Sequence, residues 1–390
     1  MSKFQRVLLF ILLFGTMLIF GMVENFKGVS FPLIRGEFGA SWEQMGLMIS
    51  MISIFYTGFS VLAGIFLGRF GVKPSYLLGF SIISAGFLAV FYLPGFFLTA
   101  SALLLASAGF GFFEISINAL ASKLFVKRAA LLMNLLHSFY GFGAVIGPIA
   151  AGYIAGSVGL SWRHAYLFTL PVSLALLIPA IIIRFPEDPR DIGVEQEKRS
   201  SFFDTLRSPL VWLMAITLSI MVTVEMSSAN WGTMYFQDIY GFDPNTDGAT
   251  FLSRFFMLFT ISRLICGFAI EKIGYMRALL GAAIISSLVF IIGFLLGETG
   301  ILVLPALGFF AAIYWPTLMA VTFIRFGKDA PIFSGAVIAI SGIFFASIQF
   351  LTGLINSYFG SAWGYRSNLV YSVILIALLV VLQKKLVDSK

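Results

Sequence analysis

Residues Asn134–Gly152 read NLLHSFYGFGAVIGPIAAG, a stretch apolar enough for a lipid bilayer that nevertheless carries polar side chains. Its first residue, His137 and Gly141 lie at i, i+3 and i+7, so an amide, an imidazole and a gap share one helical face. Just upstream, Glu114 and Asn118 share a face at i and i+4. Ionisable groups in hydrocarbon cost at least ~2.5 kcal/mol each unless they face protein or water, and they usually mark substrate or ion pathways. We interpret this helical hairpin as the working centre of a membrane transporter.

The composition excludes an ordinary soluble protein. Of 390 residues, 59% are hydrophobic and only 11% are charged, whereas a soluble domain carries roughly 25% charged residues. The net charge of +7 does not indicate a nucleic-acid partner, because Lys and Arg lie in short clusters between apolar runs, which is the pattern of orientation signals. The single cysteine, Cys266, excludes a disulfide within the chain and a cysteine-based metal site.

Twelve apolar runs are long enough to cross ~30 Å of hydrocarbon. We expect an all-α polytopic membrane protein with twelve transmembrane helices in two pseudo-symmetric six-helix bundles. The expected spans lie near residues 7–33, 43–68, 75–94, 97–122, 131–157, 166–185, 209–236, 250–270, 278–297, 299–324, 331–357 and 367–383.

A polar, highly charged stretch separates the sixth span from the seventh. It has too few apolar residues to fold by itself, so it is predicted to be a linker. The expected organisation is an N-terminal bundle at 1–185, a cytoplasmic linker at 186–208 and a C-terminal bundle at 209–390. If both termini are cytoplasmic, 19 of the 25 Lys and Arg residues lie in inside segments and three in outside loops (Arg35, Arg163, Arg366). This bias predicts that orientation, and we expect a location in the cell membrane.

An internal repeat relates the two halves. Val23-Glu24 recurs as Val224-Glu225 at an offset of 201, and Gly68–Gly71 recurs as Glu271–Gly274 at an offset of 203. Two parallel six-helix halves are the arrangement of one large class of secondary transporter.

Over its whole length the chain resembles the major facilitator superfamily. The loop between spans 2 and 3 is similar to the cytoplasmic signature of that superfamily, which latches the inward gate. The resemblance implies gating roles for Gly64, Gly68, Arg69, Gly71 and Lys73, and in the second copy for Glu271 and Lys272. The loop departs from the family pattern at Gly68, where an acid is usual. Alternatively, the basic residues are only topology anchors.

Within the superfamily, the chain resembles the fucose permease-like branch of fucose, galactose, glucose and proton symporters. The resemblance rests on Asn134-x-x-His137 leading into Gly147-Pro148, on Glu24 and Glu114, and on Glu225 followed by Asn230-Trp231. It implies that Glu24 recognises the solute and that Glu114, with His137, carries the coupling proton.

A competing motif lies in the same helix. Gly143–Gly152 also resembles the glycine-proline signature of drug and proton antiporters. Because Gly-x-x-x-Gly serves helix packing in many membrane proteins, a packing role alone is the alternative.

Depth along the spans places the charged residues in two layers. Glu114, His137 and Arg263 lie ~9–12 Å from the assumed cytoplasmic ends, and Glu24, Glu225 and Arg254 lie ~24–25 Å from them. The lower layer is a candidate proton relay and the upper a candidate binding or gating layer. Lys27 beside Glu24, and Arg254 near Glu225, either take part in function or only neutralise buried charge.

Polar and aromatic side chains complete the expected substrate site. They suit a neutral polyhydroxylated ligand, and Tyr314-Trp315-Pro316 is the leading aromatic candidate because the proline can break the tenth span. The substrate-binding candidates are Glu24, Asn118, Asn134, Tyr140, Glu225, Asn230, Trp231, Tyr314, Trp315 and Gln349.

The leading hypothesis is a proton-coupled symporter for a sugar or similar small polar solute that works by alternating access. The alternatives are a proton-coupled drug or metabolite efflux antiporter and a transporter-like solute sensor. No phosphate loop, metal-ligand cluster or nucleophile constellation is visible, so we expect no enzyme activity, cofactor or metal. The expected partners are a small-molecule substrate, protons and the lipid bilayer, and we expect a monomer.

Overall fold

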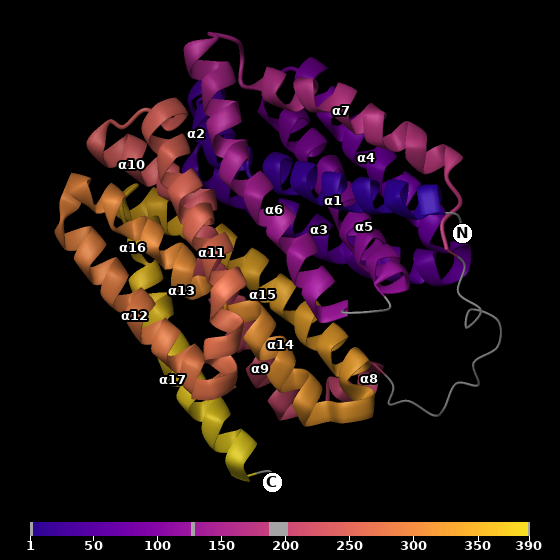
Figure 1. Ribbon diagram of the computed structural model, residues 1–390. Coiled ribbons are helices and arrows are strands. Elements are labelled where there is room, and N and C mark those ends of the chain that lie inside the picture. Colours follow the sequence, from indigo (N-terminus) through magenta and orange to yellow (C-terminus); the bar gives the residue numbers. More distant parts are fainter. Residues whose placement is uncertain (1–2, 126–128, 187–201, 389–390) are drawn as a thin grey trace. The chain divides into compact units, whose positions relative to one another are not determined.

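The computed structural model describes residues 3–125, 129–186 and 202–388, and these residues form helices without strands (Figure 1). In the first part of the chain the helices are α1 (Lys3–Glu24), α2 (Lys27–Phe38), α3 (Trp42–Phe70), α4 (Val72–Tyr92), α5 (Phe96–Leu124), α6 (Ala129–Gly152) and α7 (Arg163–Ile182). In the second part they are α8 (Phe202–Thr205), α9 (Pro209–Ser227), α10 (Thr233–Tyr240), α11 (Ala249–Ile273), α12 (Tyr275–Leu295), α13 (Leu307–Ala311), α14 (Tyr314–Phe326), α15 (Ala330–Phe359), α16 (Trp363–Arg366) and α17 (Asn368–Asp388).

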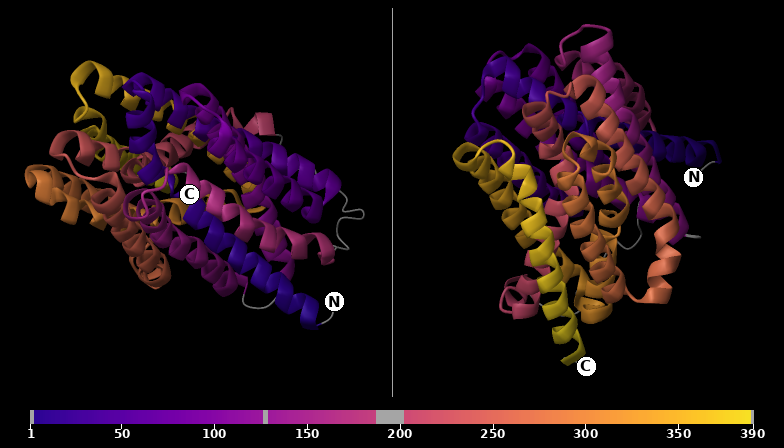
Figure 2. Two further views of the ribbon diagram at one scale, coloured as in Figure 1. Left: turned by 90° about the horizontal axis from the view of Figure 1, so that it is seen from above. Right: turned by 90° about the vertical axis from the view of Figure 1, so that its left-hand side faces the viewer.

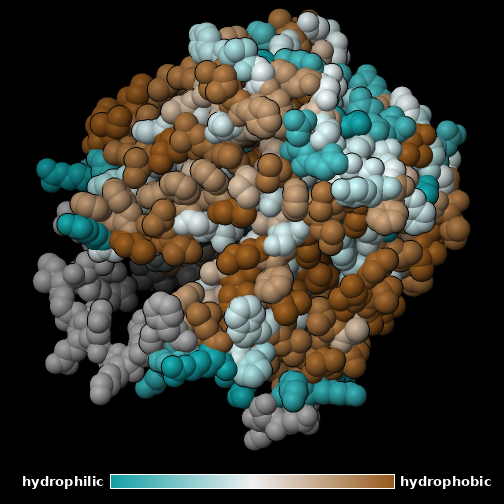
Figure 3. Space-filling model, turned by 180° about the vertical axis from the view of Figure 1, so that it is seen from behind, coloured by the Kyte–Doolittle hydropathy of each residue, from teal (hydrophilic) through white to brown (hydrophobic). Residues whose placement is uncertain are grey.

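The described residues contain twelve segments long and apolar enough to cross a membrane, as predicted. Each overlaps one of the expected spans. The segments are Phe4–Phe38, Trp42–Phe70, Val72–Tyr92, Phe96–Leu124, Leu132–Ser157, Arg163–Ile182, Pro209–Tyr240, Pro244–Gly267, Tyr275–Leu295, Gly297–Asp329, Ile332–Phe359 and Trp363–Leu386. Large apolar side chains such as Ile65, Ile182 and Leu295 are exposed, and hydrophobic residues cover much of the face seen in Figure 3. A protein with lipid as its solvent needs such a surface.

The chain forms two compact units. Unit 1 comprises residues 1–40 and 51–195, and unit 2 comprises residues 41–50 and 196–390. The first turns of α3 therefore group with unit 2, where Glu43 accepts a hydrogen bond from Ser357 of α15. Most of the expected linker at 186–208 lies outside the described residues.

Unit 1 is built on two closely packed helix pairs, α1 with α6 and α4 with α5. Its long helices run alongside one another in both views of Figure 2. At one end, Arg163 at the start of α7 donates hydrogen bonds to the carbonyl oxygens of Val90 and Leu93, at 2.5 and 3.0 Å, and to Glu37 at 3.2 Å. This single guanidinium ties the ends of α2 and α4 to α7.

The internal repeat is visible in the backbone. Gly71 precedes α4 with φ +83°, and Gly274 precedes α12 with φ +93°. Residues other than glycine rarely adopt this backbone conformation, which explains why glycine stands at both turns. Gly159 and Gly360 also have positive φ, and they are separated by 201 residues, the same offset as between Val23-Glu24 and Val224-Glu225.

Spans 1, 7 and 10 are interrupted well inside their length. Span 1 breaks between the end of α1 at Glu24 and the start of α2 at Lys27. Span 7 contains a π-helical turn, Ser228–Gly232, between α9 and α10. Span 10 breaks between α13 and Tyr314 at the start of α14, as expected from Pro316. Interrupted helices in transporters commonly line substrate or ion sites, so these breaks locate candidate sites.

Candidate functional site

Glu24 lies at the break in span 1, and both of its carboxylate oxygens have partners. Oε2 accepts a hydrogen bond of 2.6 Å from the Tyr140 hydroxyl, and Oε1 pairs with Nζ of Lys27 at 3.4 Å. The side chains of Lys27 and Glu24 retain 18% and 21% exposure. The expected Lys27–Glu24 pair is therefore present, and the carboxylate remains partly accessible.

A seam of glycines brings α6 close enough to α1 for this contact. A Cβ on Gly143 would overlap the carbonyl oxygen of Leu18, and a Cβ on Gly147 would overlap that of Met22. On α1, a Cβ on Gly21 would overlap the carbonyl oxygen of Tyr140. Small residues permit this backbone contact. The seam thus gives Gly143 and Gly147 the packing role that was the alternative to an antiporter signature.

Asn25 occupies the break itself. Its Nδ2 donates to the carbonyl oxygen of Gly21 at 2.8 Å and to the Tyr140 hydroxyl at 3.4 Å. The Asn25 side chain thereby replaces a backbone donor that the interrupted helix does not supply. It also holds the oxygen of Tyr140 in position beside Glu24. Nothing in the spacing of the sequence singled out Asn25.

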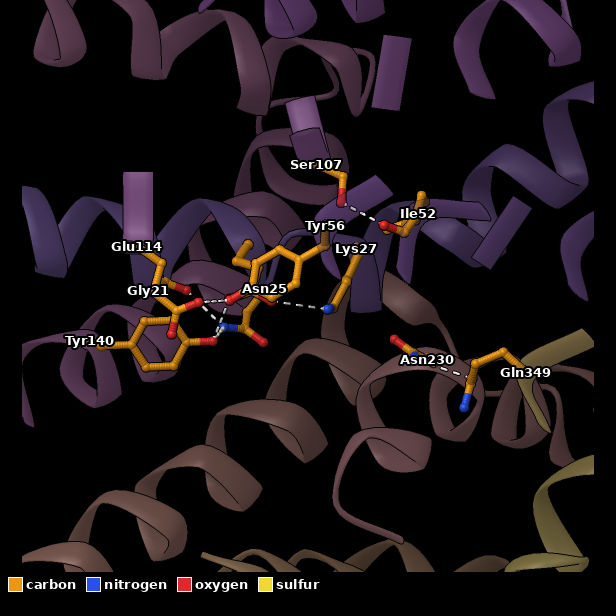
Figure 4. A network of polar contacts seen from close by, with 11 residues as sticks. Gly21, Asn25, Lys27, Ile52, Tyr56, Ser107, Glu114, Tyr140, Asn230 and Gln349 are labelled. Atoms are coloured by element: carbon orange, nitrogen blue, oxygen red, sulfur yellow. Dashed lines mark hydrogen bonds and ion pairs between the residues drawn. The ribbon is translucent and has the colours of Figure 1, made fainter. Parts of the chain in front are cut away.

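Glu114, on α5, accepts a hydrogen bond from the hydroxyl of Tyr56 on α3. Tyr56 is half-buried and also lies within electrostatic reach of Glu24 and Tyr140. Figure 4 shows Tyr56, Glu114 and Tyr140 gathered in one cluster with Asn25. The two carboxylates expected to divide solute recognition and proton transfer are therefore neighbours through Tyr56, which sequence reasoning missed.

The other polar residues of the hairpin lie around this cluster on the same two helices. Asn118 is half-buried one turn beyond Glu114, and its Oδ1 has no hydrogen-bond partner among the described residues. His137 is half-buried on α6 one turn before Tyr140, and Asn134 is exposed.

In unit 2, the π-helical turn directs two consecutive side chains to one acceptor. Nε1 of Trp231 donates to Oε1 of Gln349 at 2.9 Å, and Nδ2 of Asn230 donates to the same oxygen at 3.2 Å. In a regular α-helix consecutive residues point in clearly different directions, because one residue turns the helix by about 100°. Both side chains nevertheless reach α15 from the π-helical turn of span 7.

The remaining candidates of unit 2 divide between buried and exposed positions. Glu225 is 5% exposed and lies within electrostatic reach of the Tyr314 hydroxyl. Tyr314 is fully buried and shares a 2.8 Å hydrogen bond with Ser286, whereas Trp315 is 42% exposed. The expected arginine partner of Glu225 lies elsewhere: Arg254 is exposed and forms no ion pair with any residue that the structure describes.

Arg263, which was expected in the lower charged layer, packs against an aromatic ring. Its guanidinium carbon lies 4.3 Å from the ring centre of Phe259, one turn earlier on α11. Its Nε is buried and has no hydrogen-bond partner within the described parts of the chain. The ring face stabilises this cation in an apolar setting.

The candidate gating loop has a structural component. Nζ of Lys73 donates to the carbonyl oxygens of Ile181 and Ile183, at 2.6 and 2.8 Å, at the end of α7. A Cβ on Gly64 or Gly68 would meet no described atom within 4 Å, so no close backbone contact requires glycine at either position. Arg69, Glu271 and Lys272 are exposed.

Comparison with known families settles the class of the protein. A model of the Major Facilitator Superfamily matches residues 12–347. The chain belongs to this superfamily. It is therefore a multi-pass membrane protein of this superfamily. Among the described residues, no three His, Cys, Asp or Glu side chains gather where they could hold a metal ion.

Curated superfamily members resemble the chain over part of its length. The probable actinorhodin transporter of Streptomyces coelicolor is 28% identical over 225 residues, which cover 55% of this chain and 36% of that protein. A multidrug resistance protein B homologue of Mycobacterium tuberculosis is 28% identical over 149 residues, which cover 38% of this chain and 26% of that protein. The chain thus spans well under half the length of these relatives.

Solved structures of superfamily members share the fold over nearly the whole chain. The fucose:proton symporter FucP of E. coli is 18% identical with a TM-score of 0.68, covering 97% of this chain and 98% of that one. A bacterial homologue of the human lysosomal transporter Spinster is 16% identical with a TM-score of 0.79, covering 100% of this chain and 99% of that one. At such identities the likeness establishes the major facilitator fold.

Proposed function

We propose that this superfamily member is a proton-coupled symporter of a sugar or a similarly small polar solute. The observation that carries the proposal is the cluster of unit 1, in which Tyr56 joins the surroundings of Glu114 to those of Glu24. Two carboxylates with separate hydrogen-bond partners, one of them at an interrupted helix, provide one group for the solute and one for the proton. The fold shared with the fucose:proton symporter supports this choice.

Glu24 is the recognition-side group in this proposal. Lys27 neutralises much of its charge, so the carboxylate acts as a hydrogen-bond acceptor for solute hydroxyls rather than as an attractor of cations. Its partial exposure leaves room for such a contact. Asn118, Asn134 and Tyr140 contribute further polar groups from the neighbouring helices.

Glu114 is the coupling site, and His137, at similar depth in the membrane, takes part in proton transfer with it. Tyr56 donates a hydrogen bond that stabilises the carboxylate after its proton leaves. Solute binding then changes proton affinity, and protonation changes solute affinity, by the same coupling free energy. The exposed residues of the 2–3 loop and of its second copy serve the gate that faces the cytoplasm, where both termini lie, and the protein acts as a monomer in the cell membrane.

Proteoliposomes loaded with purified protein test the coupling. With labelled L-fucose, D-galactose or D-glucose, Glu114→Gln should retain solute–solute exchange and lose accumulation driven by an imposed pH gradient. The parent protein provides the control. Uptake by the parent that is indifferent to the gradient contradicts proton coupling, and accumulation by Glu114→Gln equal to that of the parent removes Glu114 from the coupling role.

A second candidate function is efflux of drugs or metabolites. The name of the multidrug resistance relative favours it, whereas the use of Gly143 and Gly147 in packing removes its strongest sequence argument. Overexpression should raise tolerance to a set of hydrophobic cationic drugs if the candidate is correct. Unchanged tolerance, with the protein present in the membrane, contradicts it.

A further inference from the structure

Gln349 on α15 carries a buried donor without an acceptor. The side chain is 1% exposed, and its Oε1 accepts the two hydrogen bonds from Trp231 and Asn230. Its Nε2 is buried and has no hydrogen-bond partner among the residues that the structure describes. Leaving such a donor unsatisfied destabilises the folded protein, so it calls for a functional explanation.

The direction of the Gln349 amide is set by its neighbour. An indole N–H can only donate, so the oxygen of the amide must face Trp231 and the nitrogen must point elsewhere. Trp231 is itself 2% exposed, and its ring centre lies 6.3 Å from that of Trp42. This packing restrains the indole that orients the amide.

We infer that Nε2 of Gln349 donates a hydrogen bond to the transported solute and that Trp231 is the positioning residue for this donor. The subsite in unit 2 therefore takes an acceptor oxygen, from a hydroxyl, carbonyl or carboxylate group. The inference rests on the proposed function in that the chain transports a polar solute, and it does not depend on proton coupling.

The inferred donor also has a selective effect. An ammonium group offers donors and no acceptor, so it cannot satisfy the amide nitrogen and leaves it buried and unpaired. A solute with an acceptor at this position gains the hydrogen bond that the resting protein lacks. The subsite therefore discriminates against organic cations in favour of polyols and small acids.

Three substitutions distinguish the role of the Gln349 donor from that of the packing around it. Gln349→Glu keeps an oxygen for Trp231 and replaces the donor by an acceptor, and Gln349→Met removes both at similar length. Trp231→Phe removes the N–H that orients the amide but keeps an aromatic ring. Thr217→Val is the matched control, because Thr217 is buried on α9 and its hydroxyl bonds only the carbonyl oxygen of Leu213 in its own helix, at 2.7 Å.

Purified parent and variants are screened by thermal shift and then by calorimetry against L-fucose, D-galactose, D-glucose, lactate and tetraethylammonium. For the best-bound polyol or acid, we expect an affinity about tenfold lower in Gln349→Met, at least as low in Gln349→Glu, and intermediate in Trp231→Phe. Thr217→Val should bind as the parent does. For a bound sugar, a monodeoxy analogue lacking the accepting hydroxyl should lose affinity in the parent and not in Gln349→Met.

The outcomes separate this inference from the proposed function. Equal affinity of the parent and Gln349→Met for the best-bound solute overturns the inference, because water alone then satisfies the amide, and leaves the symporter proposal standing. Preferential binding of tetraethylammonium by the parent also overturns it. If lactate binds, sugars do not, and lactate affinity falls in Gln349→Met, the sugar proposal is wrong and the inference stands. Binding of no compound by the folded parent contradicts both.

Discussion

The hydroxyl of Tyr140 on α6 lies 2.6 Å from Oε2 of Glu24, the last residue of α1. This contact depends on the glycine seam, because only residues without a Cβ let the two backbones approach so closely. It also depends on the break in span 1, where Asn25 holds the same hydroxyl. In unit 1, the same close packing of α1 against α6 therefore also positions the candidate functional groups.

Removing the Tyr140 hydroxyl should weaken solute binding without unfolding the protein. Tyr140→Phe keeps the ring, whose centre lies 5.3 Å from that of Phe20. It removes a hydrogen bond to a charged group, typically worth about 1.5–3 kcal/mol, so we expect an affinity reduced about tenfold or more in calorimetry. Tyr76→Phe, which loses a buried hydroxyl bonded to Thr16, is the control. Equal losses in both variants would show that the effect is not local.

Glu24→Gln should weaken solute binding more than proton movement. An amide can still accept from Tyr140 but cannot pair with the charge of Lys27 and offers fewer acceptor sites. We expect a solute affinity at least tenfold lower, while solute-driven proton flux persists at saturating solute. Calorimetry and a pH-sensitive dye in the same vesicles measure the two quantities. An unaltered affinity shows that the carboxylate is structural.

Gly143→Ala should destabilise unit 1 and disturb the site together. The added Cβ meets the carbonyl oxygen of Leu18, a backbone atom that cannot move aside. Overpacking of this kind costs typically about 1–3 kcal/mol, so the midpoint of thermal unfolding should fall and solute affinity with it. Gly281→Ala on α12, where a Cβ meets nothing within 4 Å, is the control and should be neutral or slightly stabilising. Loss of proton-driven transport at unchanged stability and affinity would instead support a coupling role for this motif.

The sequence predicted the spans and the repeat because both depend on local properties. A bilayer demands about twenty apolar residues per helix, and glycine at Gly71 and Gly274 meets a backbone requirement that can be recognised in isolation. The prediction of a break in span 10 near Pro316 was correct because the effect of proline on a helix is also a local property.

The contacts between helices were harder to predict. Tyr56 reaches Glu114 from another helix, 58 positions away, and a tyrosine in an apolar span carries no signal of its own. Helical depth suggested Arg254 as a partner for Glu225, but depth does not specify rotation about the helix axis, and Arg254 is exposed. Span 7 also contains a π-helical turn at Asn230 and Trp231, which shifts the directions of the side chains that follow it. Regular helical spacing does not predict such a shift.

Lys73 should matter for stability as well as for any gating. Its ammonium group bonds two carbonyl oxygens at the end of α7, where a helix dipole favours positive charge. Lys73→Met should therefore cost roughly 1–3 kcal/mol of stability, and Lys73→Arg should recover part of it. Thermal unfolding measures both. Arg69→Met, which removes an exposed side chain from the same loop, should leave stability nearly unchanged; equal effects at the two positions would indicate a shared gating role instead.

Tyr56→Phe should impair coupling while sparing exchange. Its hydroxyl is the donor that stabilises ionised Glu114, and it lies within electrostatic reach of Glu24, so it connects the proton site to the solute site. Without it, the carboxylate of Glu114 loses its hydrogen bond from α3, and solute binding communicates less with the coupling step. In proteoliposomes under an imposed pH gradient, we expect several-fold lower accumulation of labelled solute and a counterflow rate close to that of the parent.

The control for Tyr56→Phe is Tyr166→Phe, because Tyr166 also lies in unit 1 and its hydroxyl shares a 2.8 Å hydrogen bond with Ser30 rather than with a carboxylate. That variant should keep the ratio of accumulation to counterflow found in the parent. If Tyr56→Phe keeps the same ratio, Glu114 does not exchange protons through this hydroxyl. If Tyr56→Phe loses counterflow as well, the hydroxyl serves solute binding, and Glu114 belongs with Glu24 on the recognition side.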